Sequence, residues 1–234
     1  MTPLLTNTLT VLEVIGIFAF AASGMIEGIR RGVDLFGVGL LSFLTAFGGG
    51  TVRDLLLDRR PFFWVENEYW LWLTVLIAFV GPYIARSRVI EITSKTVKWP
   101  DAIGLGAWTA NGTLIAMEMG ESLMVSSLMG VVTAAVGGII RDLLLNRTPL
   151  VIIDHEFYLV IALAGGLSIS LFGFLGMPIA WAAVLGSVLV TSGRMLAMII
   201  GWKLPTIVSY LDSPTFSQIF AITHHCLSKN TMFR

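Results

Sequence analysis

The sequence carries little charge. Only 13% of its 234 residues are Asp, Glu, Lys or Arg, whereas 56% are hydrophobic. An ordinary soluble domain has about 25% charged residues, so this chain lacks the polar surface that a water-soluble globule of its size needs. We therefore expect an integral membrane protein.

Cysteine and an excess of either charge are also missing. The single cysteine, Cys226, excludes an intramolecular disulfide framework and a zinc site built on several thiolates. Fifteen Lys and Arg balance fifteen Asp and Glu, so no basic excess indicates nucleic acid. The first ten residues contain no Lys or Arg, which favours a retained first span over a cleaved signal peptide.

Motifs of catalysis are absent from the apolar segments. They contain no His-Glu metal motif, no phosphate loop ending in Lys-Ser or Lys-Thr, and no nucleophile with a nearby base. We therefore expect neither an enzyme nor a bound cofactor.

Seven apolar stretches are long enough to span a bilayer, whose core of about 30 Å needs roughly 20 residues per helix. This predicts an all-α integral membrane protein with seven transmembrane helices. If the N-terminus lies outside, eleven Lys and Arg lie on the cytoplasmic side and three outside, so the positive-inside rule places the C-terminus in the cytoplasm. We expect the inner (plasma) membrane of the cell. The predicted spans are 9–29, 33–57, 69–86, 100–118, 122–145, 156–176 and 178–201.

The chain contains an internal repeat. A shift of 88 residues aligns 13–70 with 101–158 without a gap, and GGGTVRDLLLDRRP then matches VGGIIRDLLLNRTP. Equivalent positions are three spans apart, and three is odd, so the two halves must cross the membrane in opposite directions. The predicted parts are a first three-helix repeat with its cytoplasmic linker (1–99), an inverted second repeat (100–176), a seventh helix (177–203) and a cytoplasmic tail (204–234).

The second span of each half carries small and hydroxyl-bearing residues on one face. Consecutive glycines there favour a kink, and carbonyls freed at a kink need a new partner in lipid. We expect a monovalent cation at the backbone carbonyls near Gly49 and Gly137. The alternative is that the glycines only allow close helix packing. The candidate pore residues are Ser23, Thr45, Gly48, Gly49, Gly50, Asn111, Thr133, Gly137 and Gly138.

Four charged residues follow these glycines: Arg53, Asp54, Arg141 and Asp142. A charge at the centre of a spanning helix costs about 2.5–3.5 kcal/mol, so each must pair, snorkel or face water. Neighbouring Arg and Asp point in different directions on a helix, so we expect each to find its partner on another span. The arginines either clamp the halves as ion pairs or gate a pathway, and both interpretations stay open.

Other charged residues occupy the first spans of the halves and the last span. Glu13 and Asp101 are equivalent in the repeat and either complement a helix dipole or form an acidic pore mouth. We expect Arg194, about two-thirds along the last span, to snorkel or to pair.

The doubled glycine-rich RD motif, within three spans, three inverted spans and one more, resembles the bacterial branch of the trimeric intracellular cation channel (TRIC) family. The resemblance covers roughly residues 8–202. It implies a homotrimer in membrane lipid, with a pore in each protomer that passes monovalent cations, chiefly potassium. It also implies that glycine kinks shape the pore. Val136 stands where the first half has Gly48, so the two kinks are not expected to be alike.

Two functions therefore compete. The first is a potassium-preferring cation channel lined by the second and fifth spans, with K⁺ or Na⁺ as the permeant ion. The second is a secondary transporter of a small polar solute such as a small amino acid, in which the inverted repeats alternate in access.

Overall fold

The computed structural model describes residues 3–87, 94–153 and 157–202. Within these ranges every regular element is a helix. The expected tail at 204–234 and the centre of the linker, 88–93, lie outside the described residues. The helices are α1 (Pro3–Arg30), α2 (Leu35–Leu56), α3 (Phe63–Glu66), α4 (Tyr69–Ser87), α5 (Ser94–Glu118), α6 (Leu123–Leu144), α7 (Leu150–Ile153), α8 (Tyr158–Phe174) and α9 (Ile179–Ile200).

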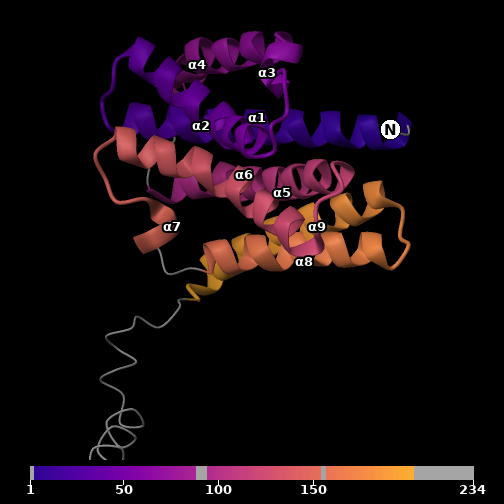
Figure 1. The fold of residues 1–234 in the computed structure, drawn as a ribbon. Helices are drawn as coiled ribbons and strands as arrows, with labels where there is room; N and C mark the ends of the chain where they lie inside the picture. Colours follow the sequence, from indigo (N-terminus) through magenta and orange to yellow (C-terminus); the bar gives the residue numbers. More distant parts are fainter. Residues whose placement is uncertain (1–2, 88–93, 154–156, 203–234) are drawn as a thin grey trace, which may run out of the picture.

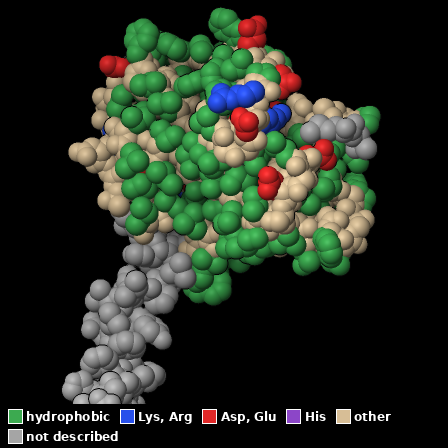
Figure 2. Space-filling view, in the orientation of Figure 1, with side chains coloured by type: hydrophobic (Ala, Val, Ile, Leu, Met, Phe, Trp, Pro, Cys, Tyr) green, Lys and Arg blue, Asp and Glu red, His purple; other side chains and the backbone are tan. Residues whose placement is uncertain are grey.

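The seven long helices fall on the seven predicted spans. The largest difference is that α1 and α5 each begin six residues before the predicted window. Four of the described helices, α1, α2, α6 and α9, are long and apolar enough to cross a membrane, whereas α8 and the apolar part of α4 (Tyr69–Tyr83) are shorter. The prediction of an all-helical protein is confirmed, while the count of seven spanning helices stays a prediction. Figure 2 shows hydrophobic side chains over most of the visible face, with charged ones in a few groups.

The helices form a bundle with four central members. α1, α2, α5 and α6 pack against one another, α4 covers α1 and α2, and α8 covers α5 and α6 (Figure 1). α9 packs on α5 and α8. The buried core between the central helices includes Phe20, Phe47, Leu105 and Trp108. Each half therefore contributes two central helices and one covering helix.

The repeat is visible in the local structure at the same 88-residue shift. α2 begins with Asp34, whose Oδ1 accepts a hydrogen bond from the amide of Gly37 at 2.7 Å. α6 begins with Ser122, whose Oγ accepts one from the amide of Val125 at 3.3 Å. Side-chain capping of this kind satisfies amides that have no partner within the helix. Equivalent residues thus start equivalent helices.

Contacts between the halves are reciprocal. Gly16 on α1 lies against the ring of Trp108 on α5, and its equivalent Gly104 lies against the ring of Phe20, the equivalent of Trp108. A contact that recurs with its two partners exchanged is what a two-fold relation between the halves produces.

Candidate functional site

α2 and α6 cross in the middle of the bundle at their glycines. A Cβ atom at Gly49 would collide with the backbone carbonyl of Thr133, and one at Gly137 would collide with that of Thr45. Both helices nevertheless run as continuous α-helix over 22 residues. The glycines therefore do not break the helices into separate segments, and the predicted kink stays a prediction. They allow backbone-to-backbone packing of the two helices at this crossing.

The two threonines at this crossing use their hydroxyl protons within their own helices. Thr45 Oγ1 donates to the carbonyl of Leu41, and Thr133 Oγ1 donates to that of Met129, each at 2.6 Å. A hydroxyl that donates keeps lone pairs that can accept or coordinate. Both side chains are buried, so the crossing offers oxygen atoms but no open space.

Arg53 forms the first of two charged clusters, which we call the Arg53 half-site. Its Nε and Nη2 donate to Oδ1 of Asp54, at 2.9 and 2.7 Å, and its Nη1 donates to Oδ1 of Asn111 on α5. All three side chains are buried. The guanidinium of an arginine from one half thus donates a hydrogen bond to a side-chain oxygen atom of the other half.

Arg141 forms the equivalent Arg141 half-site. Its Nε donates to Oδ1 of Asp142 at 2.9 Å, and its Nη1 donates both to Oδ1 of Asp101 at 2.8 Å and to Oγ of Ser23. Ser23 and Asn111 are equivalent in the repeat, so the second contact is also reciprocal. The half-sites lie about 15 Å apart, because Asp101 and Asn111 are ten residues apart on α5 and a helix rises 1.5 Å per residue.

The predicted pairing is partly confirmed and partly wrong. Each arginine has a partner on another helix, as expected. Each also pairs with the aspartate that follows it, which the expectation from helical directions excluded. Each arginine lies in the last turn of its helix. Its side chain is long and flexible enough to turn back toward the aspartate that follows it.

The short helices α3 and α7 are fixed to the half-sites. Asp54 Oδ2 accepts from the amide of Phe63 at 3.0 Å, and Asp142 Oδ2 accepts from the amide of Leu150 at 2.8 Å. The hydropathy windows missed both helices. The signal that could have found them is the gapless repeat, which continues through Pro61 and Pro149.

Further charges support the Arg141 half-site more tightly than the Arg53 half-site. Arg147 Nη1 donates to Oε1 of buried Glu27 at 2.6 Å, and its Nη2 lies 3.0 Å from Asp142 Oδ1. Its equivalent, Arg59, lies 3.8 Å from Asp54 Oδ1. Sequence reasoning missed Glu27, because an acid near a helix end is usually solvated.

Arg194 does not snorkel. Its side chain is buried, and the centre of its guanidinium lies 5.0 Å from the centre of the Tyr158 ring. Tyr158 in turn lines the Arg141 half-site, next to Asp101. The face of the Tyr158 ring attracts the buried guanidinium of Arg194 through a cation–π contact.

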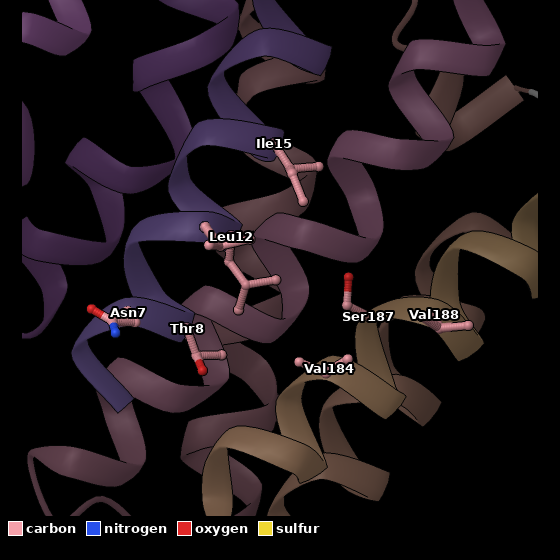
Figure 3. Close-up of a pocket in the computed structure, with 8 residues that line it drawn as sticks. Asn7, Thr8, Leu12, Ile15, Val184, Ser187 and Val188 are labelled. Atoms are coloured by element: carbon pink, nitrogen blue, oxygen red, sulfur yellow. The ribbon is translucent and has the colours of Figure 1, made fainter. Parts of the chain in front are cut away.

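The site is closed in this structure. Six candidate residues have no accessible surface at all: Ser23, Thr45, Arg53, Asp54, Asn111 and Thr133. A groove of about 330 Å³ lies away from this site, between α1 and α9. Figure 3 shows Leu12 and Ile15 on one side of this groove and Val184 and Val188 on the other. Its lining is mostly apolar and includes none of the predicted site residues.

Comparisons with known proteins identify the family. The family model described as "Glycine transporter" matches residues 10–86 and 98–174, two segments separated by the same 88 residues. A solved TRIC channel orthologue from Rhodobacter sphaeroides is similar at 31% identity and a TM-score of 0.77, covering 82% of this chain and 98% of that one. The chain belongs to the TRIC family.

Other TRIC relatives agree in length and fold. A second solved TRIC cation channel is 33% identical with a TM-score of 0.74, covering 84% of this chain and 96% of that one. Among curated proteins, the membrane protein YvgT of Bacillus subtilis is 39% identical, over 86% of this chain and 98% of its own. The inner membrane protein YadS of Escherichia coli is 31% identical, over 83% and 94%. The predicted family is confirmed, and with it a membrane protein.

Proposed function

We propose that this protein is a channel for monovalent cations, preferring potassium, with a path inside each protomer between α2 and α6. The support is its similarity to solved TRIC cation channels at 31% and 33% identity over more than four-fifths of the chain. The predicted glycines and threonines at 45, 49, 133 and 137 lie at the crossing of the two helices, and Ser23 and Asn111 contact the arginines beyond it.

The observation that carries the proposal is the row of buried polar groups through the bundle. The Arg53 half-site lies at one end, the Arg141 half-site at the other, and the carbonyls of Thr45 and Thr133 lie between them at the glycine crossing. If α2 and α6 separate at this crossing, those carbonyls become neutral ligands that can replace hydration water around a cation. We place the transient cation site there, near Gly49 and Gly137.

The charge in the interior favours cations over anions. Among the described residues, the buried charged side chains comprise five carboxylates and three guanidinium groups, an excess of two negative charges before the partly exposed Arg30, Arg31 and Arg147, which pair with Glu27 or Asp142, are counted. Acidic side chains along a pathway favour cations in channels generally. Arg53 and Arg141 are each held by a carboxylate and do not present an unpaired positive charge to a passing ion.

The arrangement in the membrane is part of the same proposal. We place the protein in the inner membrane as seven spans, with the N-terminus outside and the two repeats inverted. We also propose a homotrimer, since the Rhodobacter sphaeroides protein is described as a trimeric channel. Native mass spectrometry from detergent should then show a mass of three chains, and a monomer alone would contradict it.

The experiment that tests the function is reconstitution of the purified protein in planar bilayers. We expect unitary currents in symmetric potassium chloride. In a potassium chloride gradient the reversal potential should lie near that of potassium, and replacing potassium by sodium should reduce the current. Absence of unitary currents, or a reversal potential near that of chloride, would contradict the proposal.

The same preparation tests the alternative of a small-solute transporter. The matching family model is described as a glycine transporter, so labelled glycine is the solute to use. Saturable uptake of glycine into liposomes in the absence of unitary currents would replace the channel by a carrier. The solved relatives named above are cation channels and favour the first outcome.

A further inference from the structure

The two half-sites differ at several positions of the repeat, and one of these differences is an aromatic ring. Phe63, on α3, occupies the Arg53 half-site, and its equivalent at the Arg141 half-site is Val151, on α7. The amide that binds the aspartate is that of Phe63 at one half-site and that of Leu150, one position earlier in the repeat, at the other. Both Leu150 and Val151 line the Arg141 half-site. An aromatic ring and an isopropyl group leave very different amounts of space.

Phe63 fills the Arg53 half-site with aromatic surface. Its ring stacks on Phe47 with centroids 5.6 Å apart, meets Trp108 edge-on at 5.6 Å, and lies 5.4 Å from the guanidinium carbon of Arg53. A Cβ atom added at Gly50 would collide with this ring. Only 1% of Phe63 is accessible, so its ring is closely packed against these neighbours.

The Arg141 half-site instead contains a small cavity beside Gly138, lined by both polar and apolar side chains. Its volume is about 10 Å³, and Asp101, Arg141 and Tyr158 are among the residues that line it. A Cβ atom at Gly138 would lie 3.6 Å from Asp101 Oδ1, 3.7 Å from Arg141 Nη2 and 3.9 Å from the Tyr158 hydroxyl, all ordinary contacts. The cavity therefore has room for about one methyl group, with three polar side chains among those that line it.

These dimensions fit one water molecule. A buried water needs about 10–15 Å³ and two to four polar partners. The cavity supplies a carboxylate that accepts, a guanidinium that donates and a phenol that does either. A bare cation fits less well, because the guanidinium of Arg141 lines the same cavity.

We propose that water occupies the cavity beside Gly138 and wets the pathway from the Arg141 end, whereas Phe63 keeps the Arg53 end dry and is the plug that must move for ions to pass. An apolar constriction excludes water and with it ions. Phe63 is the first residue of α3, and the hydrogen bond from its amide to Asp54 fastens this helix to the half-site. The role of the plug in ion flow rests on the proposed channel function; the difference in wetting does not.

The test measures access to the half-sites by thiol protection. Replacing Cys226 by Ser removes the only native cysteine. Ser23→Cys and Asn111→Cys then serve as matched reporters, since they are equivalent in the repeat and contact Arg141 and Arg53 respectively. Proteoliposomes are treated with Ag⁺, a monovalent cation close to potassium in size, and protected thiols are counted by maleimide mass labelling after denaturation.

We expect the Ser23→Cys reporter to be protected about tenfold faster than the Asn111→Cys reporter, a ratio equivalent to about 1.4 kcal/mol. Phe63→Val should remove most of that difference by accelerating Asn111→Cys. Val151→Phe should slow Ser23→Cys, as should Gly138→Ala, whose methyl group fills the cavity without collision. Phe63→Leu, which preserves more volume, should give an intermediate rate even if Phe63→Val folds poorly.

Equal rates at the two reporters with Phe63 in place would overturn the proposal, as would an Asn111→Cys rate unaffected by both Phe63 variants. Thiol protection needs no current. Rates that follow the expected order in a protein without unitary currents would support the difference in wetting and contradict the channel. Unitary currents in a protein whose two reporters are protected at equal rates would support the channel and contradict the difference in wetting.

Discussion

Arg53 and Arg141 show how a strongly charged side chain is kept in an apolar interior. Each is held by the carboxylate of the following residue and by an oxygen atom from the opposite half. Removing one member of such a pair is costly because it leaves an uncompensated buried charge, whereas the intact pair contributes little net stability. The pairs therefore fix which surfaces meet more than they strengthen the fold.

Replacing Arg53 by Met should lower the free energy of unfolding by about 3–5 kcal/mol, because Asp54 would stay buried without its main partner. Reversible unfolding in mixed micelles measures the change. Arg60→Met is the matched control: Arg60 is exposed and stacks on Phe62, so its loss should change stability by less than about 0.5 kcal/mol. The double change Arg53→Met with Asp54→Leu should recover part of the loss. A single variant as stable as the control would show that the charge is solvated.

At the level of helices, the crossing of α2 and α6 depends on two positions without side chains. Gly49 and Gly137 each touch the carbonyl of a threonine on the other helix. A backbone carbonyl cannot move aside as a side chain can. Gly48, one residue away, would instead place a Cβ against the terminal methyl group of Ile140, which can rotate.

Gly49→Ala should therefore lower the free energy of unfolding by about 1–3 kcal/mol, the usual cost of overpacking. Gly48→Ala should cost less, because only the end of the Ile140 side chain must shift. Thermal unfolding of the two variants in the same detergent makes the comparison. Equal midpoints would show that the helices separate at this crossing without strain.

Sequence reasoning succeeded where a signal extends over many residues and failed where it is local. The long helices and the repeat follow from about twenty apolar residues per span and from 58 aligned positions. α3 and α7 have four residues each, which is too short for a hydropathy window. The sequence marked Ser23 and Asn111 as candidate pore residues but could not show that they bind the arginines. The roles of Phe63 and Glu27 depend on which helix packs beside them, and no local pattern contains that information.

Considered as a whole, the molecule is two similar halves with exchanged contacts. If the halves are inverted in the membrane, equivalent loop residues must lie on opposite sides. Arg60 and Thr148 are equivalent and both are exposed. With Cys226 replaced by Ser, a cysteine at 60 should react with an impermeant maleimide added to intact cells, and a cysteine at 148 should react only after the membrane is opened. Labelling of both cysteines from the same side would contradict the inversion.

The exchanged contacts also mean that neither half has a complete hydrophobic core without the other. Gly16 packs against the indole of Trp108 and Gly104 against the phenyl ring of Phe20, and in each contact the ring comes from the other half of the polypeptide. Made as two separate proteins, the halves should therefore be degraded singly yet assemble when produced in the same cell, much as subunits of an obligate heterodimer do.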